Sequence, residues 1–93
     1  MEKEINELIK FNDNLIEKIK KYEKNLLFVK VLNDKEIEKK VKILLYLQST
    51  INQSIQIGNY KRAFKFILLL EYIVKQLPEI NKQIIRKISE KII

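Results

Sequence analysis

The chain has 93 residues, 46% of them hydrophobic and 33% charged, which is enough apolar material for one core and gives a net charge of +7. It contains no cysteine and no histidine, so disulfides, thiolate metal sites and the commonest acid–base residue are excluded. A single glycine and a single proline argue against a β-rich or disordered chain. We therefore expect one all-α domain over residues 1–93, a small antiparallel bundle of about four helices.

The first predicted helix covers residues 2–32. Its apolar residues alternate at spacings of three and four, which is typical of a heptad seam, and Asn12 occupies one seam position. Such a residue either pairs with its symmetry mate, fixing register, or lies at the rim of the bundle bonded to water. Flanking isoleucines favour the rim. Asn12-Asp13-Asn14 is poor helix sequence, but the seam stays in phase across it, so one continuous helix is expected.

The second predicted helix runs from Asp34 to about Ile57. Asn33, followed three residues later by Glu36, matches a capping box and indicates where this helix begins. Residues 43–60 carry no charge but keep many hydrogen-bonding side chains. A solid apolar run early in this segment predicts that the middle of the helix is enclosed on every side. Either the protein's own bundle encloses it, or it forms the buried middle of a protein–protein interface.

Gly58 is expected to end this helix in a left-handed conformation, and Asn59 to cap the next one. The stretch Gly58-Asn59-Tyr60-Lys61-Arg62-Ala63 resembles the turn and second-helix start of a tetratricopeptide repeat, with its Gly-x-Tyr-x-x-Ala pattern. The resemblance covers about a dozen residues of one hairpin, whereas stable arrays need at least three repeats. We interpret it as shared turn chemistry, not as membership of that family.

The third predicted helix, Tyr60 to Leu77, is apolar on almost every side, which predicts burial in its own core or against a partner. Ile67 and Leu69 are expected among its core residues. Pro78 fits the first turn of a fourth helix, which is amphipathic on isoleucines. Because the loops between these helices are short, consecutive helices should be antiparallel, in an up-down-up-down order.

Positive charge is concentrated in residues 58–93, which hold eight Lys and Arg against three acidic residues. Such a surface attracts phosphates or an acidic protein, although general solubility would also account for it. The cations expected to make this contact are Lys61, Arg62, Lys65, Lys82, Arg86, Lys87 and Lys91. Only two of them are arginines, so any nucleic-acid contact should be to the backbone and not sequence-specific.

No catalytic constellation can be assembled from these residues. Phosphate-binding loops and dinucleotide fingerprints require more than the single glycine of this chain, and zinc-protease motifs require histidines, of which it has none. Glu71 is an isolated carboxylate within the apolar third helix, where pairing with Lys75 is favoured over a functional role. We therefore expect a non-enzyme with no cofactor and no metal. The N-terminus has no apolar signal-like stretch, which favours a cytoplasmic protein.

The apolar helices offer more surface than a few short neighbours can cover, so we expect a homodimer or a subunit of a larger assembly, without membrane contact. The expected interface residues are Tyr46, Thr50, Gln53, Ile57, Phe66, Leu69 and Ile73. The favoured function is a non-enzymatic accessory subunit of a nucleic-acid-handling complex, for replication, transcription or a CRISPR-type machine. The alternative is a pure protein-interaction module, an adaptor or an inhibitor encoded by a virus or mobile element.

Overall fold

The computed structural model describes residues 1–92, and every regular element within them is an α-helix. The six helices are α1 (Glu2–Lys20), α2 (Glu23–Leu26), α3 (Val29–Leu32), α4 (Lys35–Gln56), α5 (Tyr60–Val74) and α6 (Leu77–Ile92). The all-α prediction is confirmed. The predicted bundle of four helices is not, because the first predicted helix is divided into three and the last one does not fold back.

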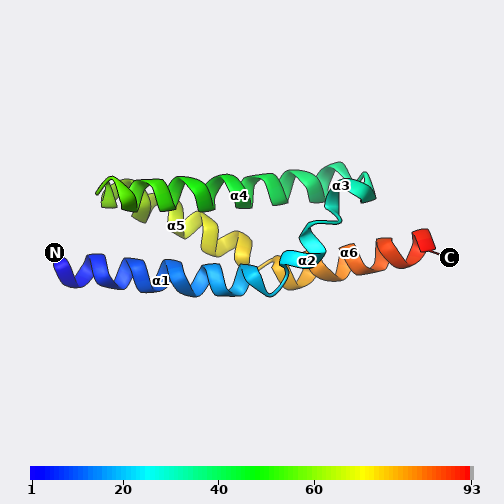
Figure 1. The fold of residues 1–93 in the computed structure, drawn as a ribbon, viewed down its shortest axis with the longest axis horizontal. Helices are drawn as coiled ribbons and strands as arrows, with labels where there is room; N and C mark the ends of the chain where they lie inside the picture. The colour runs from blue at the N-terminus through cyan, green and yellow to red at the C-terminus, as the bar shows by residue number, and fades with distance from the viewer. Residues whose placement is uncertain (93) are drawn as a thin grey trace.

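The molecule is elongated, with principal extents of 55 × 18 × 17 Å and a radius of gyration of 15.0 Å. A compact domain of this length would have a radius of gyration of about 12 Å. Helix α4 runs along one side, while α1 and α6 follow one another along the opposite side (Figure 1). Helix α5 crosses diagonally between them. The two ends of the described chain therefore lie at opposite ends of the molecule.

The chain first reverses direction at Asn33 and Asp34. Asn33 has a left-handed φ of 55° and ends α3, while Asp34 caps α4 by accepting hydrogen bonds from the backbone N–H groups of Glu36 and Ile37, both at 3.1 Å. The sequence predicts Asn33 as the cap, which is wrong by one residue. Both residue types cap well, but Asn also tolerates the left-handed conformation that this reversal requires.

The second reversal, at Gly58 and Asn59, agrees with the prediction. Gly58 has a φ of 78°, its N–H donates to the Ile55 carbonyl at 3.1 Å, and the Asn59 N–H donates to the Ser54 carbonyl at 2.8 Å. This is the Schellman arrangement that ends a helix at a glycine. The Asn59 side chain then accepts a hydrogen bond from the Arg62 N–H at 3.2 Å, which caps α5. Helices α4 and α5 therefore form an antiparallel hairpin.

The predicted continuous helix over residues 2–32 is wrong after Lys20, although α1 does continue through Asn12-Asp13-Asn14. The backbone leaves helical geometry at Tyr22, with φ −108° and ψ 2°. Because of this break, α2 and α3 cross from the side of the molecule that holds α1 to the side where α4 begins (Figure 1). Val29 and Leu32 become buried there, since α3 contacts both α4 and α6.

The junction between α5 and α6 bends without reversing the chain. Lys75 keeps right-handed helical angles, with φ −63° and ψ −24°, and the Gln76 N–H donates to the Ile73 carbonyl at 2.9 Å. Pro78 occupies the first turn of α6, as predicted. Because the backbone stays helical at the junction, α6 continues toward the same end of the molecule as α5 (Figure 1). The expected up-down-up-down order is therefore not formed.

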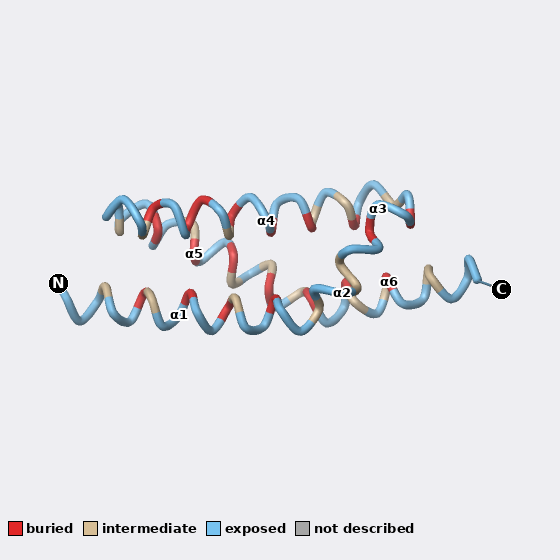
Figure 2. Tube along the Cα trace, in the orientation of Figure 1, coloured by how far each residue is buried: buried red, intermediate tan, exposed pale blue. Residues whose placement is uncertain are grey.

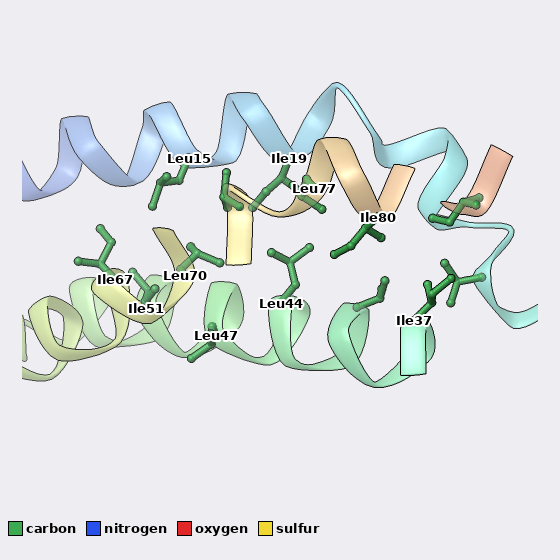
Figure 3. Packing of buried hydrophobic residues seen from close by; sticks show 14 of the residues in the cluster. Leu15, Ile19, Ile37, Leu44, Leu47, Ile51, Ile67, Leu70, Leu77 and Ile80 are labelled. Atoms are coloured by element: carbon green, nitrogen blue, oxygen red, sulfur yellow. The ribbon is translucent and has the colours of Figure 1, made fainter. Parts of the chain in front are cut away.

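The core is one hydrophobic cluster that extends along the molecule between α4 and the other helices. Leu15, Ile67 and Leu70 gather near Ile51 in one part of it, and Ile80 approaches α4 farther along (Figure 3). Along each long helix, buried positions alternate with exposed ones (Figure 2). Each helix is thus covered on one side only, which leaves other sides of α4 and α5 open.

Candidate protein-interaction surface

Helices α4 and α5 expose large apolar side chains that the sequence places in an enclosed core. Leu44 and Leu47 are buried, but Ile43, Leu45 and Tyr46 are exposed, so the alternative in which the protein's own bundle encloses the middle of α4 on every side is wrong. On α5, Ile67 is buried as expected. The expected core position of Leu69 is wrong, because its side chain is 52% exposed; Phe64, Leu68 and Tyr72 are also exposed. The hairpin has neighbours on one side only, which is why these residues remain uncovered.

Part of this exposed surface forms a regular face on the side of the hairpin away from α1. On α4 its residues recur at spacings of three and four, and on α5 the same spacing continues, so each set lies along one line of its helix. We term it the outer face; it consists of Ile43, Tyr46, Thr50 and Gln53 on α4, of Ile57, which caps the end of α4, and of Phe66, Leu69 and Ile73 on α5. None of these eight residues is charged, but Arg62 precedes Phe66 by four residues and its guanidinium lies over the Phe66 ring, so a cation borders the face at the start of α5.

The seven interface residues expected from the sequence all belong to the outer face. Tyr46 and Ile57 are 61% and 65% exposed, Gln53 is exposed, and Phe66 and Ile73 are half-buried. Thr50 is only 5% exposed and lies at the base of the face, between the two helices. The sequence prediction omits Ile43, which precedes Tyr46 by three residues; the same spacing could have identified it.

Helix α1 covers the opposite side of the hairpin, which we term the inner side. Asn12 is buried there, and its Nδ2 donates to the Asn52 Oδ1 at 3.0 Å, while its own Oδ1 has no partner within the protein. The expectation that Asn12 lies at a hydrated rim is wrong. Asn52 of α4 sits directly opposite and pairs with it inside the same chain, so no symmetry mate is needed.

A shallow apolar groove lies beside the inner side, between α1 and α5. It has a volume of about 300 Å³ and is lined by Glu4, Glu7, Leu8, Phe11, Phe64, Ile67 and Leu68. Sequence reasoning does not identify this groove. The seam on α1 places Phe11 next to the packed residues, but the residues of α5 that face it depend on how the two helices cross.

The basic residues of α6 are partly engaged inside the molecule. Lys87 forms an ion pair with Asp34, and the Lys91 Nζ donates to the Val31 carbonyl oxygen at 2.7 Å. The Lys87 ammonium, followed by the Ile37 N–H, lowers the pKa of Asp34 below its ordinary value. These two lysines therefore hold α6 against the segment that leads into α4. Lys82 and Arg86 are exposed.

The remaining basic residues lie near the start of α5. Lys61, Arg62 and Lys65 are exposed, and the Arg62 guanidinium lies over the Phe66 ring at 5.9 Å from its centroid, a cation–π distance. Helix α5 begins at one end of the molecule and α6 runs to the other (Figure 1). The seven cations expected to share one surface are therefore divided into two separate groups.

Residues 1–92 were also searched for a metal site, a functional carboxylate and a membrane-spanning helix. This part of the chain contains no group of three or more acidic side chains arranged to hold a metal ion. Glu71 contacts Lys75 at 3.9 Å, as expected for a surface pair. None of the helices in this range is long and apolar enough to cross a membrane. Comparisons of the chain with protein-family models, curated proteins and solved structures find no match.

Proposed function

We propose that the protein is a non-enzymatic helical interaction module that docks onto another protein chain through the outer face. One observation carries this proposal: the eight residues of the outer face are all uncharged, in a chain of which 33% is charged, and a cation borders them only at Phe66, where Arg62 lies over the ring. Depletion of charge, with aromatic and hydrogen-bonding side chains retained, is typical of the buried centre of an interface. Exposed Tyr46 and half-buried Phe66 supply the aromatic side chains.

The total surface of the chain also supports docking. The protein exposes 6925 Å², whereas a compact monomer of 11.2 kDa is expected to expose about 5700 Å². The excess arises because the molecule is elongated and because α4 and α5 are covered on one side only. A standard interface buries about 800 Å² from each partner, an area of the same order as this excess.

Site-specific photo-crosslinking in the native source tests the proposal. A photoreactive amino acid at Tyr46 should yield covalent adducts with a protein chain. The same amino acid at Leu68, whose side chain is 65% exposed but lines the groove between α1 and α5, should yield far fewer. If a photoreactive residue at Tyr46 and another at Leu69 both give no protein adduct, the outer face is not a docking surface and the proposal is wrong.

A second candidate function is that of an accessory subunit in a nucleic-acid-handling complex. Lys61, Arg62 and Lys65 are exposed, and none of the three has an ion-pair partner among residues 1–92. They lie on the hairpin that carries the outer face. A protein docked through that face would therefore bring three free cations to backbone phosphates, consistent with the net charge of +7.

Salt dependence distinguishes this second candidate. Each phosphate contact contributes about −0.7 to −0.9 to the slope of log affinity against log salt concentration. Replacing Lys61, Arg62 and Lys65 together by Glu should reduce that slope, and acidic residues in a first helical turn do not oppose the helix dipole. Replacing Lys18, Lys20 and Lys21 by Glu is the control. No measurable binding to single- or double-stranded DNA or RNA at low salt, with or without the protein partner, would exclude this function.

A further inference from the structure

A pocket near the middle of the molecule brings together two segments that are far apart in the sequence. It lies where α1 ends and where α5 bends into α6, two places that are adjacent in Figure 1. Its volume is about 290 Å³, near the lower limit for pockets that hold small ligands. The residues that line it are Lys18, Lys21 and Tyr22 from the first segment and Val74, Lys75 and Pro78 from the second.

Two helix junctions form this pocket, which we term the lysine pocket. Lys18, Lys21 and Tyr22 are spaced by three and four residues, so they lie on one side of α1 at its end. The backbone leaves helical geometry at Tyr22, and the chain turns away into α2. Val74 and Pro78 line the pocket from either side of the bend between α5 and α6. The pocket therefore depends on the same two junctions that give the molecule its elongated shape.

The charged residues that line the lysine pocket are all lysines. Lys18 and Lys21 have no ion-pair partner among residues 1–92, and Lys75 contacts Glu71 at 3.9 Å. Glu79 follows Pro78 but does not line the pocket. The carbonyl ends of α1 and α5 lie here, and each carries about half a negative charge. Three ammonium groups exceed that charge, so the pocket remains positive and attracts an anion.

The rest of the lining is apolar or aromatic. Val74 is buried, Tyr22 is half-buried and Pro78 is exposed. Small-molecule pockets combine such apolar walls with a few polar groups that fix the orientation of the ligand. The Tyr22 hydroxyl is a further group that can donate a hydrogen bond. The lining thus suits a ligand that carries one anionic group on an apolar body.

The number of ammonium groups favours a phosphomonoester as that anion. A phosphomonoester carries a charge of about −1.5 to −2 at pH 7 and offers three strong acceptor oxygens on one group. In a nucleic-acid backbone each phosphate carries only one charge, and the charges are spread along the strand. Three lysines around one pocket match the first arrangement. The pocket is also distinct from the cations at the start of α5, on which the second candidate function depends.

We infer that the lysine pocket binds a small phosphomonoester that carries an aromatic group. Lys18, Lys21 and Lys75 hold the phosphate, while Tyr22, together with the two apolar residues of the second segment, contacts the aromatic group. This site goes beyond the proposed function, because no residue of the outer face lines it. A free nucleotide and a phosphorylated tyrosine both have the required chemistry.

An NMR titration of the isotope-labelled full chain with phenyl phosphate tests the inference. Amide signals of residues 18–22 and 74–78 should shift together and saturate, with a dissociation constant of about 1 mM or below. Dimethyl phosphate, a diester with a single charge, should bind at least about tenfold more weakly. Adenosine monophosphate and phosphotyrosine, titrated in the same way, distinguish a nucleotide from a phosphorylated side chain as the source.

Two double variants separate the lysine pocket from general attraction to a basic protein. Lys18→Gln combined with Lys21→Gln should weaken the binding of phenyl phosphate about tenfold, because each substitution removes a charged donor. Lys20→Gln combined with Lys24→Gln is the matched control. It removes the same charge from exposed lysines nearby that do not line the pocket, so the affinity should stay within about twofold.

The absence of saturable shifts at about 10 mM phenyl phosphate would overturn the inference. Equal losses of affinity in the two double variants would also overturn it, since net charge alone would then explain the binding. Dimethyl phosphate that binds as tightly as phenyl phosphate would overturn the assignment to a phosphomonoester. The proposed function is judged separately, by photo-crosslinking at Tyr46 and Leu69, which do not line the lysine pocket.

Discussion

The two sides of the α4–α5 hairpin have similar residue spacing, but another helix of the chain covers only one of them. On the inner side, α1 packs against the hairpin and buries Leu8, Asn12, Leu15 and Ile19 of its own seam. On the outer face, residues at the same spacing stay largely exposed, and no charged residue interrupts them. The comparison shows that hydrophobic spacing identifies a packing surface without revealing which chain covers it. The lack of charge along the outer face is the additional pattern on which the proposed docking rests.

The largest expected effect on the free energy of unfolding comes from replacing a buried residue of α5, and an exposed residue on the other side of α5 serves for comparison. Ile67→Ala should lower the free energy of unfolding by about 2–5 kcal/mol, because Ile67 is fully packed in the core. Leu69→Ala should change it by no more than about 0.5 kcal/mol in dilute protein, since the side chain is exposed. Urea denaturation measures both values. Equal costs at low protein concentration would mean that the two sides of α5 do not differ as described.

The second prediction concerns the buried polar pair on the inner side. Asn12→Leu keeps the branched shape of the side chain and removes its unpartnered oxygen, so it should raise the free energy of unfolding by about 1 kcal/mol. Asn52, which is exposed, can replace the lost hydrogen bond with water. Asn14→Leu, on the exposed side of α1, is the control and should have little effect. A marked loss of stability in Asn12→Leu would show that the Asn12–Asn52 bond outweighs the cost of the unpartnered oxygen.

The smallest effect is expected away from both sides of the hairpin, at Asp34. Its pKa is lowered by Lys87 and by the Ile37 N–H, so the folded state favours the ionised carboxylate. This contribution is present above the unfolded pKa of about 3.9 and is lost as the pH falls through the lower folded value. Asp34→Asn should therefore be less stable than wild type at neutral pH, and the difference should disappear in acid.

Thermal unfolding from neutral to acidic pH measures this difference. Asp13→Asn, at an exposed position of α1 without an ion pair among residues 1–92, is the matched control and should show a smaller pH dependence. A difference between Asp34→Asn and wild type that stays constant with pH would mean that the Asp34–Lys87 pair does not stabilise the fold.

Features determined by a few adjacent residues could be predicted from the sequence. Gly58 and Asn59 form the expected turn, and Pro78 lies in the first turn of its helix, because each depends on local backbone geometry. The break at Tyr22 could not be predicted in this way. It serves the packing of α2 and α3 against distant helices, and heptad spacing alone continues through it. The direction of α6 likewise depends on the neighbours that it contacts.

For the candidate site, too, patterns within one or two helices could be read from the sequence, whereas contacts between distant residues could not. The seven predicted interface residues stay a prediction, which rests on regular spacing and missing charge, two patterns that are visible in the sequence of one or two helices. The basic residues could not be assembled correctly from the sequence. Whether the cations at the start of α5 and those of α6 lie together depends on the bend between the two helices, which directs α6 away from the start of α5 (Figure 1). Likewise, the engagement of Lys87 with Asp34 joins residues far apart in the sequence.

The turn at Gly58 and Asn59 joins α4 directly to α5, so the most extensive helix–helix contact in the molecule lies between neighbours in the chain. Closing so short a loop costs little entropy, and local contacts of this kind form quickly during folding. The hairpin should therefore act as the folding nucleus, onto which α1 and α6 condense later from either side. The outer face belongs wholly to this nucleus.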